Sequence, residues 1–420
     1  MSLETGELWR AAVETWAWLL AGAWCWQTSN AVRFVPTLPD LTSLDWDRQP
    51  ARAATLTVVV PARDEAENIA ATLDALLQAD YTELKIVVVD DRSTDATGTI
   101  MDAYVQEQGL GKKQPALDVI HVKELPVGWL GKTFAMAQAT EKSDSEYLLF
   151  TDADVLFSPS VLRRAMVCAL ESQADHLVVL PTMQVRSWGE GVVLGFFQIL
   201  GMWHSRLWRV SDPKARDFVG VGAFNLVRRE ALQEIGGWVP QRLAVLEDVT
   251  LGRRMKAAGM RQRIAFAPGL VLVHWASGAR GLMRVMTKNL FSAFNFQPLL
   301  LLGMCGWIAV FCVAPLAGLG WWPTVMPSLL VLCCVGATYR LMGEASLIDA
   351  RYGWLYPLGA LAFVAAMVRS MATVLAQGGV EWRGTFYVLS ELRRHNSPLL
   401  WNKRAAPAKT QIPFGNDKSR

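Results

Sequence analysis

A long uncharged stretch near the carboxyl end constrains this chain most, because it has to be kept away from water. Residues 299–320 have the sequence LLLLGMCGWIAVFCVAPLAGLG, and about 20 apolar residues suffice for a helix to cross the hydrocarbon core of a bilayer. Residues 323–339 follow two tryptophans and are also uncharged. Together the two stretches predict a transmembrane hairpin.

A third apolar stretch, residues 354–376, contains Arg369. A charge at such depth is typical of a side chain that snorkels, of a paired charge, or of a segment that does not fully span. We expect a transmembrane region over residues 299–379 in which this third segment crosses the bilayer or lies at its surface. The composition agrees, since only 19% of the residues are charged, against about a quarter in soluble domains.

The amino-terminal residues 1–32 contain a shorter apolar run, WAWLLAGAWCW at 16–26. Glu14 and the polar residues 27–30 limit its length. It lacks the basic region and the small-residue cleavage site of a signal peptide. The run predicts a membrane anchor or an interfacial helix, and we favour the anchor.

Between these apolar regions, residues 55–298 predict an α/β domain, reached through a proline-containing linker at 33–54. Continuous apolar runs are typical of strands buried on both faces of a parallel sheet. Five such runs cover residues 55–61, 84–90, 118–122, 147–152 and 176–181. The first two flank an amphipathic helix pattern, which predicts a β–α–β unit of a Rossmann-like, mostly parallel sheet flanked by helices.

Three other regions bear on the organisation of the chain. Residues 189–210 are rich in aromatics and predict either an ordinary core helix or an interfacial helix that docks on the bilayer. Residues 380–420 predict a basic tail, disordered after about residue 407. The net charge of +3 gives no support to nucleic-acid binding, and the six cysteines show neither metal-site nor disulfide spacing.

Acidic residues follow three of the predicted strands, in VVVPARDEAEN, VVVDDRSTD and LLFTDADV. Side chains two positions apart on an extended segment point the same way, so Asp152 and Asp154 should share one side. Two such carboxylates repel unless a cation or a proton joins them, and oxygen ligands favour Mg²⁺ or Mn²⁺. The alternative is a strand-end turn in which one aspartate caps the next helix.

Two further acidic segments have structural and functional interpretations. Asp91 would accept hydrogen bonds from a nucleotide base or ribose, unless its segment only forms a turn in which Thr94 or Asp95 caps the next helix. Glu247 and Asp248 begin a helix pattern in LAVLEDVTLGRRMKAAG. In isolation they would be ordinary carboxylates at a helix amino terminus.

Taken together, these segments resemble the inverting glycosyltransferases of family 2, which have the GT-A fold. The matching segments occur in the family's order over about residues 55–265: VVVPARDEAENI, VVVDDRSTDATG, GWLGKTFAMAQA, LLFTDADVLF, GVGAFNLVRREALQEIGGW and VLEDVTLGRRMKAAG. A soluble domain followed by membrane helices is most similar to membrane-bound bacterial members associated with lipids, carotenoids or hopanoids. Ceramide glucosyltransferases are more distantly similar.

The resemblance implies a metal site and a catalytic base. Asp152 and Asp154, with Mg²⁺ or Mn²⁺, would hold the diphosphate of a nucleotide sugar. Asp248 would remove the proton of the acceptor hydroxyl as it attacks the anomeric carbon, with Glu247 as the competing base. Single displacement would invert that centre.

The resemblance also implies binding residues around this core. Asp91 and Glu65 would contact the nucleoside. Lys132 would neutralise phosphate, unless it is simply an exposed lysine. His274 would be a third metal ligand, unless its role is structural.

One family feature is missing. Processive and ceramide-type relatives carry a Gln/Arg-x-x-Arg-Trp motif, whereas here Arg280 and Arg284 have a different spacing and no tryptophan follows. We therefore expect transfer of a single sugar, from a nucleotide donor that is UDP-linked by preference, to a lipid-like or isoprenoid acceptor. The alternatives are a polyprenyl-phosphate sugar synthase and a non-catalytic membrane scaffold.

The expected location is the bacterial cytoplasmic membrane, with several crossings and the catalytic domain facing the cytoplasm. Arg340 and Arg351 should then lie inside by the positive-inside rule. The tail carries Arg383, Arg393 and further basic residues and also prefers the inside, yet three crossings after the domain would place it outside. Either residues 354–376 do not cross, or the rule fails here.

Overall fold

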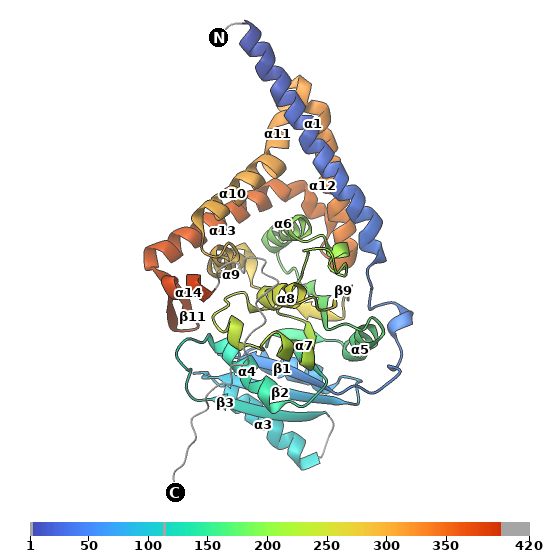
Figure 1. Cartoon of the computed structure of the whole chain (residues 1–420), viewed down its shortest axis with the longest axis vertical. Helices are drawn as coiled ribbons and strands as arrows, with labels where there is room; N and C mark the ends of the chain where they lie inside the picture. Colours follow the sequence, from blue (N-terminus) through green and yellow to red (C-terminus); the bar gives the residue numbers. More distant parts are fainter. Residues whose placement is uncertain (1–2, 112–114, 396–420) are drawn as a thin grey trace.

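The computed structural model describes residues 3–111 and 115–395 (Figure 1). The tail beyond residue 407, expected to be disordered, lies outside them. Within the described residues, an α/β domain sits at one end of the molecule. A group of long helices projects from the other end (Figure 1).

The main sheet of the described chain has seven strands in the order β3-β2-β1-β4-β8-β6-β9. All neighbours are parallel except β8, which is antiparallel to both β4 and β6. The strands are β1 (Leu56–Ala62), β2 (Leu84–Asp91), β3 (Ala116–Val122), β4 (Tyr147–Phe150), β6 (His176–Leu180), β8 (Asn225–Arg228) and β9 (Gln262–Phe266). Five of them correspond to the five predicted runs, and the mostly parallel sheet is confirmed.

Helices cover both faces of this sheet, which explains the continuous apolar runs. In β1, Val58 and Val60 belong to one buried cluster, and Val59 belongs to the cluster on the other face. The predicted helix between the first two strands is α2 (Ile69–Leu77). With α2, helices α3 (Thr97–Gly111) and α5 (Val161–Glu171) cover one face, and α4 (Gly131–Lys142), α7 (Arg229–Glu234) and α8 (Glu247–Ala257) cover the other.

A small second sheet has the order β5-β10-β7, with strands β5 (Val155–Phe157), β7 (Thr182–Met183) and β10 (Val271–Val273). Val273 of β10 lies opposite Val155 of β5 in an antiparallel pair. His274 follows Val273 and Asp154 precedes Val155, so these two residues lie at the same end of the β5–β10 pair.

Three helical segments of the described chain are long and apolar enough to cross a membrane: Pro298–Gly318, Trp322–Ser346 and Ala350–Gln377. They contain α10 (Pro298–Ile308), a π-helical turn (Ala309–Val313), α11 (Ala314–Ala317), α12 (Trp322–Ser346) and α13 (Tyr356–Gln377). The amino-terminal run is part of one long helix, α1 (Leu3–Phe34), that packs along α12 (Figure 1).

Polar groups of α1 are satisfied by the neighbouring helices. Trp24 donates its indole N–H to the carbonyl oxygen of Phe311, at 2.9 Å. The Phe311 carbonyl lacks its usual helical partner, because Pro315, four residues later, has no N–H to donate. Phe311 also lies within the π-helical turn. Gln27 donates to the Met202 carbonyl, at 2.8 Å, so a polar residue that shortens the apolar run is buried against the neighbouring helix α6 (Trp188–His204).

The remaining elements connect the two ends of the molecule. They are α6 (Trp188–His204), α9 (Gly278–Ala293), the hairpin of β11 (Gly379–Trp382) and β12 (Thr385–Val388), and α14 (Leu389–His395). Most of α6 is buried, and it packs against α13, with the rings of Phe196 and Phe363 at 5.9 Å. This part of residues 189–210 is therefore a core helix.

Candidate active site

Four segments that are distant in sequence meet at the carboxyl ends of the central strands. They are the start of α4, the residues after β4, the residues before β8, and the start of α8. Together they line a cavity, whose walls include Lys132, Phe150, Thr151, Gly222, Asn225, Trp238, Glu247 and Asp248. Ligands of open α/β sheets gather at this edge, so the cavity is the candidate active site.

Lys132 is the cationic centre of the site. Its Nζ lies 2.5 Å from Asp152 Oδ1 and 2.5 Å from Glu247 Oε1. Burial alone would lower the pKa of Lys132, but the carboxylates of Asp152, Glu247 and Asp248 raise it overall. The side chain is only 26% exposed, so the alternative of an exposed lysine is wrong.

The residues after β4 are held in place from both sides. Thr151 donates its hydroxyl to the Ala223 carbonyl, and Thr72 donates to the Ala153 carbonyl, both at 2.8 Å. Burial raises the pKa of Asp154 well above the usual carboxyl range, and the nearby carboxylates of Asp152 and Glu65 raise it further. A cation shared by Asp152 and Asp154 would remove this penalty.

The donor set fits a hard divalent cation. Mg²⁺ is usually held by one or two carboxylates, with substrate phosphates and water completing its shell. No group of three or more histidine, cysteine, aspartate or glutamate side chains is placed to hold a metal ion within residues 3–111 and 115–395. The role of Asp152 and Asp154 as metal ligands stays a prediction.

His274 is not in a three-residue cluster with these aspartates. Its Nε2 is buried without a hydrogen bond and lies 3.5 Å from Glu190 Oε2. Glu190 in turn accepts hydrogen bonds from the backbone N–H groups of Arg186 and Gly278. These contacts favour the structural role over the metal-ligand role, and the latter stays a prediction.

Glu247 and Asp248 form the first turn of α8, where the helix dipole stabilises carboxylates. Glu247 is paired with Lys132. Asp248 accepts a hydrogen bond from the N–H of Val249, at 2.7 Å. Burial raises the pKa of Asp248, and so does the Glu247 carboxylate, while Lys132 opposes the rise. The raised pKa is compatible with Asp248 as a general base, and this role stays a prediction.

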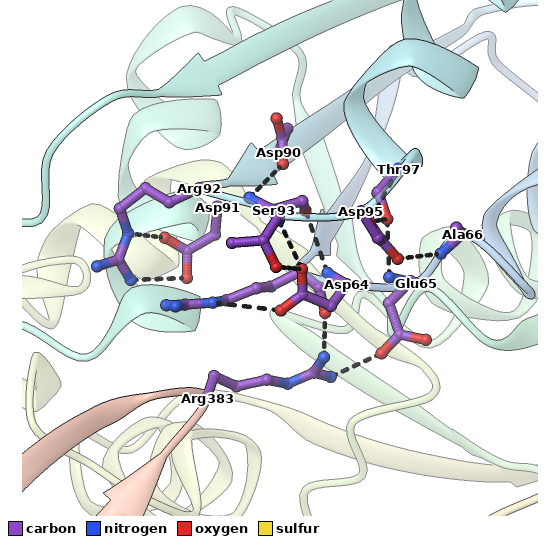
Figure 2. A network of polar contacts seen from close by, with 12 residues as sticks. Asp64, Glu65, Ala66, Asp90, Asp91, Arg92, Ser93, Asp95, Thr97 and Arg383 are labelled. Carbon is purple, nitrogen blue, oxygen red and sulfur yellow. Dashed lines mark hydrogen bonds and ion pairs between the residues drawn. The ribbon is translucent and has the colours of Figure 1, made fainter.

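The predicted nucleoside contacts lie in a polar network between the turns after β1 and β2 (Figure 2). Asp91 is held by Arg92, whose Nε donates to Oδ1 at 2.8 Å. Glu65 accepts a hydrogen bond from Arg383 at 2.6 Å. Asp95 accepts the backbone N–H of Thr97, the first residue of α3, at 2.9 Å, so Asp95 has the predicted capping role.

Two glycines that the sequence analysis did not single out shape the cavity. A Cβ on Gly222 would lie 2.5 Å from Asp152 Oδ2, and one on Gly220 would lie 1.9 Å from the Asp248 carbonyl oxygen. The segment therefore passes between the candidate metal ligand and the candidate base only because it lacks side chains there. The motif GVGAFN contains this signal, since two glycines flank a single valine.

A buried polar network holds the segment that contains Gly220 and Gly222. The Gln262 side chain donates to the Val219 carbonyl at 3.0 Å and accepts from the Val219 N–H at 3.1 Å. It also donates to Nδ1 of His176 at 2.8 Å, and His176 Nε2 lies 3.1 Å from Asn225 Oδ1. These residues tie β6, β8 and β9 to the glycine segment.

Comparisons with known proteins agree with this geometry. Residues 57–236 match the model of glycosyl transferase family 2. The 4,4'-diaponeurosporenoate glycosyltransferase of Staphylococcus aureus (strain MRSA252) is 21% identical over 362 residues, which cover 80% of this chain and 89% of that protein. The solved mannosyltransferase PcManGT from Pyrobaculum calidifontis, in complex with GDP-Man and Mn²⁺, is 18% identical with a TM-score of 0.51 and covers 87% of this chain and 99% of its own. Residues 57–236 therefore form a glycosyl transferase family 2 domain, and the sheet with its flanking helices has the GT-A fold.

Proposed function

We propose that the protein is a membrane-bound inverting enzyme that transfers one sugar from a nucleotide sugar to a lipid-like acceptor. The carrying observation is the convergence of Asp248 with the Lys132, Asp152 and Glu247 cluster at one edge of the sheet. The reaction brings a negatively charged donor diphosphate and an acceptor hydroxyl into one cavity. Lys132 supplies a charge opposite to that of the diphosphate, and Asp248 supplies a base for the hydroxyl proton.

Each side chain has a distinct task in this proposal. Asp248 takes the proton of the acceptor hydroxyl while the hydroxyl oxygen attacks the anomeric carbon, and the bond to the nucleoside diphosphate breaks. Lys132, which is ion-paired with Glu247, offers positive charge to the diphosphate. A divalent metal held by Asp152 and Asp154 would stabilise the departing diphosphate.

The turns after β1 and β2 are the proposed nucleoside site, with Asp91 and Glu65 as hydrogen-bond acceptors for the base or ribose. UDP-linked sugars are the first donors to test. GDP-mannose is the second, because the mannosyltransferase with the same fold was solved with GDP-Man.

The acceptor and the location follow from the apolar part of the chain. Three segments are able to cross a membrane, and a relative is named as a 4,4'-diaponeurosporenoate glycosyltransferase, which supports a lipid-like acceptor. Nucleotide sugars are cytosolic, so we place the catalytic domain on the cytoplasmic side of a bacterial inner membrane.

The test is an incubation of membranes containing the protein with a panel of labelled nucleotide sugars and Mn²⁺ or Mg²⁺, followed by separation of the lipid extract. We expect one donor to label one lipid band, and the label to be absent when Asp152 and Asp154 are both replaced by alanine. If no donor labels any lipid with either metal, the proposed function is wrong.

A further inference from the structure

The chain returns to the catalytic domain after the third apolar helix. The turn of the β11–β12 hairpin contains Arg383 and Gly384, both with positive φ. Arg383 donates hydrogen bonds to the Arg63 carbonyl and to the Glu65 carboxylate, the latter at 2.6 Å (Figure 2). The hairpin thus touches the turn after β1, at the proposed nucleoside site.

A second contact brings the same region back to the start of the apolar helices. Arg393 of α14 donates to the carbonyl of Phe296, at 2.9 Å, and Phe296 lies two residues before α10. The chain therefore leaves the domain at α10 and is back beside its point of departure by α14. Any bilayer that it meets in between has to be crossed an even number of times.

The two crossings are provided by α10–α11 and by α12. Both project away from the domain alongside α1 (Figure 1), and Trp24 of α1 bonds to Phe311 between α10 and α11. At the far end, the Arg10 guanidinium lies over the Trp321 ring, at 6.0 Å. In contrast, α13 runs across the domain, over α9 and α6 (Figure 1).

The two faces of α13 differ in the way expected of a helix lying on a domain. Its inner face is buried, with Ser370 accepting the N–H of Phe291 at 3.0 Å and Gly359 in close contact with Phe196 of α6. The outer face carries exposed apolar side chains: Leu358, Leu361, Val368 and Leu375. Arg369 is exposed beside them.

We propose that α13 does not cross the bilayer but lies in its interfacial layer, with Leu358, Leu361, Val368 and Leu375 against lipid. In this position Arg369 reaches the headgroups instead of the hydrocarbon core. The helix then holds the β11–β12 hairpin over the nucleoside edge of the catalytic domain. This inference rests on the membrane attachment in the proposed function.

The distribution of charge supports this arrangement. It also removes the conflict noted above, in which three crossings after the domain would place the basic tail outside. The turn between α11 and α12, residues 318–321, carries no charge. Arg10 lies at this far end, but more arginines outside the sheet domain lie on the side of the catalytic domain: Arg33, Arg340, Arg351, Arg369, Arg383, Arg393 and Arg394. With α13 in the interface, all of them lie on the cytoplasmic side, as the positive-inside rule requires.

The topology is tested on the full-length chain with its six cysteines replaced by alanine, and with single cysteines introduced as Glu67→Cys, Phe386→Cys and Gly320→Cys. All three positions are exposed. A membrane-impermeant maleimide should label Glu67→Cys and Phe386→Cys from the same side and Gly320→Cys from the opposite side. Labelling of Phe386→Cys together with Gly320→Cys would overturn the inference.

A second measurement avoids the cysteine background. Carboxyl-terminal fusions of the natural chain to green fluorescent protein and to alkaline phosphatase should give a fluorescent fusion and an inactive phosphatase. The reverse pattern would overturn the inference. A protein that alkaline carbonate extracts from membranes would count against the proposed membrane attachment, whereas a misplaced hairpin counts against this inference alone.

The lipid contact is tested by nitroxide labels at Leu361→Cys in α13 and Leu329→Cys in α12, in vesicles of phosphatidylethanolamine and phosphatidylglycerol. We expect the label at position 361 to lie near the headgroups and the label at 329 to lie deeper. Equal depths would show that α13 enters the core. Spin–spin broadening at 361 would show that a second copy covers this face, and either result overturns the lipid assignment.

Discussion

Lys132 and Glu247 form an ion pair of 2.5 Å between the first turns of α4 and α8. A lysine at a helix amino terminus is unfavourable by the helix dipole, whereas a glutamate there is favourable. Asp152 and Glu247 offset the cost for Lys132, and Lys132 in turn screens their mutual repulsion. The pair therefore joins α4, the end of β4 and α8 into one charged unit.

Lys132→Met should remove the cation while keeping most of the side-chain volume. We expect sugar transfer to fall by on the order of 100-fold, because a preorganised charge facing the diphosphate is lost. The thermal stability at pH 7 should also fall, because Asp152 and Glu247 lose their shared cationic partner. Lys142→Met, at the exposed carboxyl end of the same helix, should change neither. Full activity of Lys132→Met would exclude the proposed role.

Asp248→Asn tests the base. Loss of the proton acceptor should lower kcat by about 10²- to 10⁴-fold and leave donor binding nearly unchanged. Glu247→Gln should strengthen donor binding instead, since the Lys132 charge is then no longer shared with Glu247 and is free for the donor diphosphate. Steady-state kinetics and donor titration separate the two effects. If Asp248→Asn keeps most of its activity, the acceptor is a phosphate that needs no strong base, as in a polyprenyl-phosphate sugar synthase.

Gly222→Ala should disturb the candidate metal site, because the new Cβ would lie 2.5 Å from Asp152 Oδ2. We expect Mn²⁺ to bind at least about tenfold more weakly, the scale of other changes next to metal ligands. Titration calorimetry with Mn²⁺ measures this directly. The control is Gly201→Ala in α6, where no atom lies within 4 Å of the added Cβ. Equal Mn²⁺ affinity in the two variants would argue against Asp152 as a ligand.

Much of this architecture is predictable from local sequence patterns. The runs at β1, β2 and β4 are apolar at successive positions because both faces of the sheet are covered, and each acidic segment follows a strand end. The path of α13 is not predictable in this way, since hydropathy describes a helix's surroundings and not its direction. The contact of Arg383 with Glu65 joins residues 318 positions apart, and no local pattern reports it.

Arg383→Ala tests whether the hairpin orients the nucleoside site. The pair with Glu65 is partly exposed, so its contribution is about 1 kcal/mol or less. Its loss should raise the donor KM by up to about fivefold with little change in kcat. Arg383→Lys should restore part of the affinity, and Arg340→Ala, in the exposed pair with Glu344, should have no effect on KM. A lower KM for Arg383→Ala would instead mean that Arg383 competes with the donor for Glu65.

His176 should make the fold sensitive to acid. Burial lowers the pKa of His176 from 6.5 to about 4, and the hydrogen bond with Asn225 opposes this shift only in part. The Gln262 amide already donates to Nδ1, so a proton on that nitrogen would face a donor and not an acceptor. Between these two pH values the unfolded chain binds the proton and the folded chain does not. The stability from neutral His176 is therefore complete above pH 6.5 and is lost as the pH falls towards 4. At about 1.4 kcal/mol per pKa unit, the loss is about 3 kcal/mol.

Unfolding temperatures of the purified protein in detergent, measured from pH 7.5 to pH 4.5, show this loss. His176→Gln should flatten the decline, since an amide does not titrate, even if it lowers the stability at pH 7.5. His121→Gln is the matched control with the opposite sign, because hydrogen bonds to Asp102 and Asp90 raise the pKa of His121. That substitution removes a contribution that is present at low pH, so it should steepen the decline. Parallel curves for the natural chain and His176→Gln would show that other groups control the acid response.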